Sequence, residues 1–96
     1  MFGVKGRPFV FYTYILRSPK DGRLYVGSTA DLNRRLRRHN GGLVPATRHR
    51  RPLELVWQET HASRSGAARR ETFLKSLKGS REKARLISQA RLPESV

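Results

Sequence analysis

Residues 12–39, with the sequence YTYILRSPKDGRLYVGSTADLNRRLRRH, decide the fold of this chain. The segment 9–17 is rich in aromatic and β-branched residues and predicts a strand. Both faces of this strand are mostly apolar, which is typical of a strand packed between two layers. Turn residues at 18–22, SPKDG, then favour a reversal into a short antiparallel strand at 23–27. The short loop places Tyr14 and Tyr25 opposite one another or within about two residues of register.

A helix is predicted directly after the second strand. Ser28 and Asp31 have the serine-x-x-acid spacing of a capping box, which predicts the start of the helix at Ser28. Two consecutive glycines end it at about residue 40. Leu32 and Leu36 are four residues apart and form its buried stripe. Gly27 is expected to be structural, because glycine permits a sharp corner between the strand and the helix.

The remaining sequence predicts one more strand and two more helices. The strand is expected at 53–58, LELVWQ. Ser63 or Ser65 can cap a second helix that runs to about residue 78 and ends at Gly79. A last helix is expected from Ser80. The order ββ-α-β-α-α indicates the α/β class, as an α+β sandwich in which helices surround a small three-stranded mixed or antiparallel sheet.

The length and the composition limit the classes of function. A single domain is expected over residues 9–91, with a flexible basic lead-in at 1–8 and a tail at 92–96. The chain has no cysteine, which excludes disulfides and thiolate metal sites. Neither an export signal nor an apolar run of about twenty residues is visible, so we expect a cytoplasmic bacterial protein without a membrane span.

Charge is the strongest signal in the composition. The chain has 21 basic and 7 acidic residues, which gives a net charge of +14. Such a surface attracts polyanions, of which nucleic acid is the commonest. Anionic lipid is the rival partner, but the sequence has no long basic amphipathic helix with bulky aromatic residues on its apolar face. We therefore expect a nucleic-acid partner.

Four residues of the opening stretch suit phosphodiester chemistry. Hydrolysis of a phosphodiester needs a group that takes a proton from water and positive charge beside the phosphate. Tyr14 and Tyr25 are candidate bases or proton relays. Arg35 and His39 are four residues apart and share a helix face, where they can supply the charge and an acid or base. Each has a plain structural alternative, as a core tyrosine, a solvated arginine or a surface histidine.

Acidic residues are scarce, which limits the metal chemistry that the chain can support. Two-metal sites draw on several carboxylates, whereas a single Mg²⁺ can keep most of its waters and share phosphate oxygens with the substrate. Glu71 is the candidate ligand, because it lies among basic residues in the segment AARRETFLK. The alternative is a helix ion pair with Arg70, Lys75 or Lys78. His49 and His61 do not have the spacing of zinc ligands.

Further basic residues are candidate phosphate contacts. They lie on the predicted first helix, on the basic loop that follows it and next to the glutamate. The candidates are Arg34, Arg38, Arg48, Arg50, Arg51 and Lys75.

These elements together resemble the GIY-YIG nuclease domain, and most closely its small stand-alone bacterial members. The resemblance covers about residues 12–86 and includes YTY at 12–14, YVG at 25–27, Arg35, the HN pair at 39–40 and Glu71, in that order. It implies that Tyr14 and Tyr25 are the tyrosines of the two triplets. One of them would act as general base or orient the attacking water.

The same resemblance implies roles for the other residues. Gly27 matches the glycine of the second triplet, and Arg35 matches the arginine that neutralises the scissile phosphate. His39 matches a histidine that a subset of members has, and Glu71 matches the glutamate that binds one divalent ion, Mg²⁺ or Mn²⁺. The family hydrolyses DNA in repair, recombination, restriction and intron homing.

Two hypotheses follow for the function. The first is a metal-dependent endonuclease that cleaves DNA according to structure rather than sequence, in repair or recombination. The second is a nucleic-acid-binding module that keeps the nuclease fold without useful catalysis. DNA is the expected substrate and RNA the alternative, and a separate protein partner could supply targeting.

Overall fold

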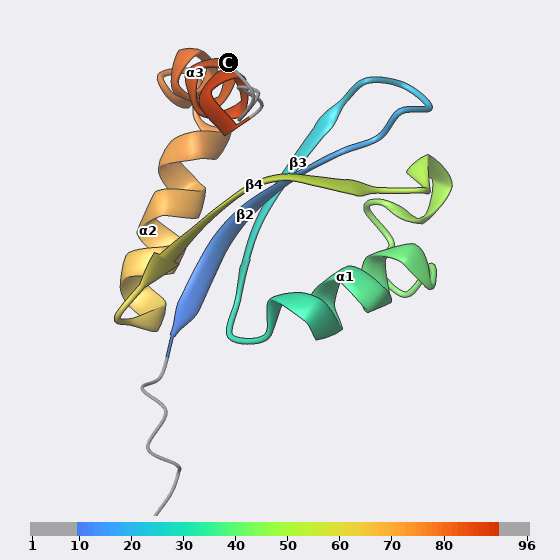
Figure 1. Ribbon diagram of the computed structural model, residues 1–96, viewed down its shortest axis with the longest axis horizontal. Coiled ribbons are helices and arrows are strands. Elements are labelled where there is room, and N and C mark those ends of the chain that lie inside the picture. The colour runs from blue at the N-terminus through green and yellow to red at the C-terminus, as the bar shows by residue number, and fades with distance from the viewer. Residues whose placement is uncertain (1–9, 91–96) are drawn as a thin grey trace, which may run out of the picture.

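The structure is a computed structural model that describes residues 10–90. The lead-in predicted at 1–8 and the tail predicted at 92–96 lie outside the described residues. Within residues 10–90, three strands and three α-helices form a two-sided sandwich (Figure 1). The strands are β2 (Phe11–Arg17), β3 (Leu24–Thr29) and β4 (Glu54–His61). The helices are α1 (Leu32–Asn40), α2 (Arg64–Lys75) and α3 (Gly79–Ala90), and a 3₁₀ turn, η1, spans Arg48–Arg50.

The sheet is antiparallel, and the first strand of the hairpin lies at its centre. The strand order is β3-β2-β4, so β2 has a hydrogen-bonded neighbour on each side. Tyr14 pairs with Gly27 and Leu16 pairs with Tyr25, so the two tyrosines lie two positions apart in register. The α+β sandwich and the register range predicted from the sequence are confirmed.

Each face of the sheet carries its own core, as the apolar faces of the first strand predict. On one face, Tyr14 and Leu16 pack with Leu32 of α1 and with Leu53. On the other face, Ile15 of β2 packs with α2 and α3. Side chains alternate between the faces of a strand, so each successive residue of β2 belongs to a different layer. Figure 1 shows α1 on one side of the sheet and α2 with α3 on the other.

The predicted start of the first helix is wrong by about one turn. Ser28 pairs with Thr13 and belongs to β3. Asp31 is the N-cap, and its side chain accepts a hydrogen bond from the Arg34 backbone N–H at 3.0 Å. Because Asp31 alone caps the helix, Ser28 is not needed as a cap and can take part in the sheet. The strand therefore continues to Thr29.

The boundary between the last two helices also differs from the prediction. Ser63 caps α2 as expected, but α2 ends at Lys75, and Gly79 is the first residue of α3. A side chain at position 79 would meet the carbonyl oxygen of Phe73 and the backbone of Leu74. This glycine therefore permits close contact between two helices. β4 is also longer than predicted and continues to His61.

No helix among the residues that the structure describes has the length and apolar character needed to cross a membrane.

Candidate functional site

The Tyr14 side chain lies across strand β3 toward the edge of the sheet. A Cβ atom at Gly27 would lie 2.5 Å from the Tyr14 Oη atom and 2.6 Å from Cζ. The phenol can occupy this position only because residue 27 is a glycine and has no Cβ atom. The predicted reason for Gly27 is therefore wrong, because the glycine lies inside the strand and not at a corner. Tyr25 lies on the same face, with its ring centroid 6.4 Å from that of Tyr14.

His39 extends from the last turn of α1 to these two phenols. Its Nε2 atom lies 3.1 Å from the Tyr14 Oη atom, and its ring meets the Tyr25 ring edge-on at 4.9 Å. The Nδ1 atom lies 2.8 Å from Oγ1 of Thr47, in the loop that follows the helix. The side chains of Tyr14, His39 and Thr47 are fully buried. The alternative of a surface histidine is therefore excluded.

Burial sets the protonation states of this group. Burial raises the pKa of Tyr14 to about 12, against the opposing effect of the nearby Arg35 guanidinium. Burial, and then the positive charge of Arg35, lower the pKa of His39 to about 4. Near neutral pH, the site thus holds a protonated phenol and an uncharged imidazole.

Arg35 lies one turn before His39 on α1, as the four-residue spacing predicts. Its charge acts on Tyr14 and on His39, and its side chain is half-buried. Arg34, Arg37 and Arg38 of the same helix are exposed. The structure thus separates one arginine, which faces the phenol, from three that face solvent.

Glu71 reaches the site from α2, on the opposite face of the sheet. Its Oε1 atom accepts a hydrogen bond from the Ser28 hydroxyl at 2.7 Å, and its Oε2 atom lies 2.6 Å from Nζ of Lys75. Ser28 directly follows Gly27, the residue against which the Tyr14 phenol lies, so this hydrogen bond brings the carboxylate close to the phenol. The ion pair expected as an alternative for Glu71 exists, and its partner is Lys75. The edge of β3 is the place where groups from both layers meet.

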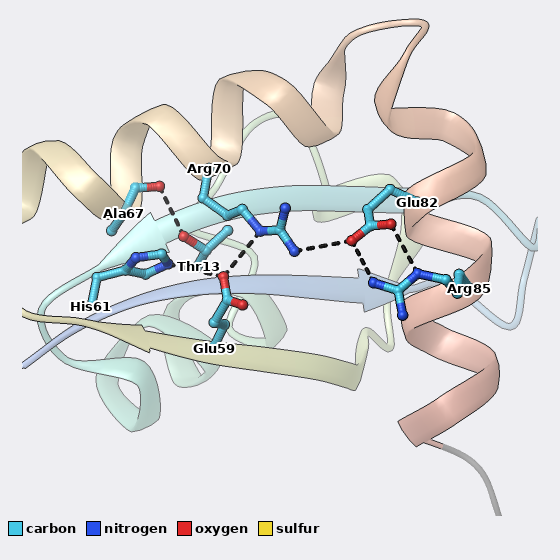
Figure 2. A network of polar contacts seen from close by, with 7 residues as sticks. All are labelled: Thr13, Glu59, His61, Ala67, Arg70, Glu82 and Arg85. Atoms are coloured by element: carbon cyan, nitrogen blue, oxygen red, sulfur yellow. Dashed lines mark hydrogen bonds and ion pairs between the residues drawn. The ribbon is translucent and has the colours of Figure 1, made fainter.

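A polar network holds α2 in position beside the site (Figure 2). The buried hydroxyl of Thr13 donates to the Ala67 carbonyl oxygen at 2.8 Å, one turn before Glu71. Arg70 extends from α2 to Glu59 of β4 at 3.0 Å and to Glu82 of α3 at 3.3 Å. The backbone that carries Glu71 is thus fixed to the central strand, to an edge strand and to the last helix.

The predicted phosphate contacts lie in three different environments. Arg34 and Arg38 line a polar hollow of about 400 Å³ together with Arg35, Ser28 and Arg64. This hollow lies at the start of α1 and beside the first residue of α2. Arg64 is a basic residue that the sequence reasoning missed, because nothing in the spacing relates the start of the second helix to the first.

The basic loop after α1 is less uniform than its sequence suggests. Arg48 and Arg51 are exposed there. The Arg50 side chain is only 19% exposed, and its Nε atom pairs with the Asp21 carboxylate at 3.3 Å, so its role as a phosphate contact stays a prediction. Arg50 therefore connects this loop to the β2–β3 turn. Lys75 is tied to Glu71.

The donor set fits a divalent ion that keeps most of its own waters. Among residues 10–90, no group of three His, Cys, Asp or Glu side chains is arranged to hold a metal ion. Glu71 is a single carboxylate beside a phenol and an arginine-lined hollow. A carboxylate has about four lone-pair sites, so acceptor capacity remains after the bonds to Ser28 and Lys75. Mg²⁺ binds through one or two carboxylates when substrate phosphates complete its coordination, and this site can offer that arrangement.

Sequence reasoning missed three hydroxyl residues of the site: Thr13, Ser28 and Thr47. The sequence pattern predicts Ser28 as a helix cap and gives Thr13 no role beyond its place in the strand at 9–17. Thr47 lies eight residues after His39 in a loop, and no periodicity relates the two residues. The one sequence feature that could have indicated a role for Thr47 is that it is a single threonine within a basic segment.

Comparison with known proteins gives concordant results. The family model described as the GIY-YIG catalytic domain matches residues 10–84. A UPF0213 protein of Staphylococcus epidermidis is 42% identical over 66 residues, which cover 68% of this chain and 79% of that protein. A UPF0213 protein of Staphylococcus saprophyticus is 39% identical over 79 residues, which cover 81% of this chain and 94% of that protein.

A solved structure agrees with the fold. The solution NMR structure of a UPF0213 protein from Bacillus halodurans superposes with a TM-score of 0.52 at 38% identity. The match covers 83% of this chain and 84% of that one.

Proposed function

The chain belongs to the family of GIY-YIG catalytic domains, and we propose that it is a metal-dependent endonuclease that hydrolyses DNA phosphodiester bonds. One observation carries the proposal. Tyr14, His39 and Arg35 from one layer of the sandwich and Glu71 from the other meet at the edge of β3. A packing role alone does not account for a carboxylate, a guanidinium and a buried phenol–imidazole pair at one place.

The geometry supports a division of roles among these residues. Tyr14 is buried in this structure, so its hydroxyl must become accessible to water when substrate binds. It then accepts a proton from the attacking water and passes its own proton to His39 Nε2, which lies 3.1 Å away. Arg35 provides fixed positive charge where the phosphate gains negative charge. Tyr25 packs against the His39 ring and restricts its orientation.

Glu71 is the residue that would hold a divalent ion, Mg²⁺ or Mn²⁺, with Ser28 orienting the carboxylate. The bound ion would supply positive charge to the scissile phosphate and its leaving oxygen. The hollow of Arg34, Arg38 and Arg64 would hold neighbouring phosphates of the strand.

A cleavage assay on nicked, branched and single-stranded DNA, with Mg²⁺ or with EDTA, tests the proposal. We expect cutting that needs the metal and is lost in Arg35→Ala and in Glu71→Gln. Arg37→Ala is the matched control, because Arg37 is an exposed arginine on the same helix. If both site variants cut at the parent's rate, the activity does not come from this site.

Substrate choice is the finer part of the proposal. The candidate phosphate contacts beside the site are arginines, which contact phosphates more readily than bases. We therefore propose selection by DNA structure, in repair or recombination. Cleavage restricted to a single base sequence across the panel would contradict it.

The second candidate is a nucleic-acid-binding module without useful catalysis. The observation in its favour is that both oxygens of Glu71 already have partners, Ser28 at 2.7 Å and the Lys75 ammonium at 2.6 Å. Such a module would bind the labelled substrates and leave them intact with or without Mg²⁺. Measuring binding and cleavage on the same DNA separates the two functions.

A further inference from the structure

Thr47 is a buried hydroxyl in contact with the site, and neither its position in the sequence nor the motif accounts for it. Its side chain has no exposed surface, and its Oγ1 atom lies 2.8 Å from Nδ1 of His39 and 3.5 Å from the Val44 carbonyl oxygen. His39 bonds with its other nitrogen, Nε2, to the Tyr14 phenol. Three side chains and one backbone carbonyl thus form a continuous chain of polar atoms through the core.

The direction of each hydrogen bond follows from the chemistry of the groups. Tyr14 is a buried phenol with one O–H proton that needs an acceptor. Arg35 beside it has only donors, and among the described residues His39 Nε2 is the acceptor within reach of the Tyr14 hydroxyl. The phenol therefore donates to Nε2, and the single proton of the neutral imidazole is on Nδ1. That N–H donates to Thr47 Oγ1, and the Thr47 hydroxyl donates to the Val44 carbonyl oxygen.

We propose that Thr47 is a positioning residue that holds His39 in the Nδ1–H tautomer, so that Nε2 stays free to take the proton of Tyr14. The inference rests on the proposed nuclease function. As the water attacks phosphorus, its proton goes to Tyr14 Oη and the Tyr14 proton goes to Nε2. The new phosphorus–oxygen bond forms as the bond to the leaving oxygen breaks. The proton on Nε2 then returns through Tyr14 to the leaving oxygen or to solvent.

The surroundings of the imidazole make the tautomer matter. The groups that face His39 are Tyr14, Tyr25 and Thr47, with the charge of Arg35 nearby, and no carboxylate is bonded to either nitrogen. An unconstrained neutral histidine side chain carries its proton preferentially on Nε2, and in this site that proton would point at the phenol and block the transfer. The bond from Nδ1–H to Thr47 reverses the preference.

The first test measures the tautomer directly, without DNA or metal. Long-range ¹H–¹⁵N NMR correlations of the full chain at neutral pH assign the His39 tautomer, with His49→Gln and His61→Gln used to identify the other two histidines. We expect Nδ1–H in the parent and in Thr47→Ser, and mainly Nε2–H in Thr47→Val. An Nε2–H tautomer in the parent overturns the proposal.

The second test measures cleavage. Thr47→Val should lower kcat roughly 10- to 100-fold with little change in KM, less than the 10²- to 10⁴-fold effect of removing a general acid or base. Thr47→Ser should restore cleavage to within about threefold, because it keeps the oxygen at Oγ. Equal cleavage by Thr47→Val and the parent overturns the positioning role. A parent that does not cleave at all but shows the expected tautomer change in Thr47→Val contradicts only the proposed nuclease function.

Discussion

At the scale of single residues, the site depends on one missing side chain. Gly27 has no Cβ atom, and the Tyr14 phenol takes the space that such an atom would occupy. Ordinary strand residues would fit the backbone of β3, since the φ angle of Gly27 is not in the left-handed region. The constraint on this position comes from the neighbouring strand.

Gly27→Ala tests this constraint. The added methyl group would displace the phenol, so we expect cleavage to fall at least roughly tenfold and the free energy of unfolding to fall by about 1–3 kcal/mol. Gly66→Ala is the control, because a Cβ there meets side-chain atoms alone, the Ser63 hydroxyl at 3.1 Å and the His61 side chain at 3.6 Å. Cleavage assays and urea unfolding measure the two effects. Parental cleavage by Gly27→Ala would show that the Tyr14 position is not critical.

His39 gives a prediction for stability as a function of pH. Its pKa is about 4 in the folded protein and near 6.5 in the unfolded chain, so the unfolded chain binds a proton in this interval that the folded protein does not bind. The free energy of unfolding is therefore fully retained above pH 6.5 and falls as the pH decreases toward 4. The expected loss from this residue is roughly 2–4 kcal/mol.

Urea unfolding between pH 7.5 and 4 measures this loss. The decrease should be clearly smaller in His39→Gln than in the parent. His49→Gln, which changes an exposed histidine, should decrease like the parent. The same slope in all three proteins would mean that His39 is protonated in the folded state as readily as in the unfolded chain.

At the scale of elements, α2 is the part that the site must hold in place. Arg70 connects it to β4 and α3 through Glu59 and Glu82 (Figure 2). Its guanidinium also lies 5.8 Å from the centre of the Trp57 ring. Arg85 binds the same Glu82, but the two residues belong to one helix, α3. The two arginines thus form a matched pair, one between elements and one within an element.

Arg70→Met is expected to lower the free energy of unfolding by roughly 1–2 kcal/mol, because two carboxylates lose a shared partner. Arg85→Met should cost clearly less than Arg70→Met, because Arg85 forms an exposed pair within one helix. Chemical denaturation of both variants measures the difference. Equal losses would argue that the bridge between elements adds nothing to the stability of the sandwich.

The sequence predicted the elements better than their ends. The strand predicted at 9–17, which the structure has at 11–17, follows from its aromatic and β-branched composition. The helix face shared by Arg35 and His39 follows from their four-residue spacing, and both signals depend on neighbouring residues alone. The start of α1 could not be predicted in this way, because it depends on the pairing of Ser28 with Thr13, fifteen residues earlier in the chain. The role of Gly79 could not be predicted either, because it depends on contact with the backbone of Phe73 in the preceding helix. The contact of Glu71 with Ser28 likewise joins residues 43 positions apart.

At the scale of the whole molecule, the net charge of +14 predicts strong and salt-sensitive binding to DNA. Most of the basic side chains lie elsewhere in the chain, but Arg34 and Arg38 line the hollow beside the site. These two side chains should therefore contribute to the salt dependence of binding.

Fluorescence anisotropy in EDTA, which prevents cleavage, tests this contribution. Each phosphate contact adds about 0.9 to the slope of log K against log salt concentration, so Arg34→Gln and Arg38→Gln should each lower the slope by about 1. Arg81→Gln on α3 is the control and should leave the slope unchanged. A change in Arg81→Gln equal to that in the other two would mean that DNA binds without preference for the hollow.

Thr13 and Tyr14 are consecutive residues of the central strand, and one anchors α2 while the other enters the site. A deletion or insertion that slid this strand by a single position would exchange the two, so the hydroxyl would meet His39 and the phenol would be driven into the helix layer. Attachment of α2 and proton transfer would fail together. The loops of this protein can therefore tolerate insertions and deletions, whereas its central strand can tolerate only substitutions.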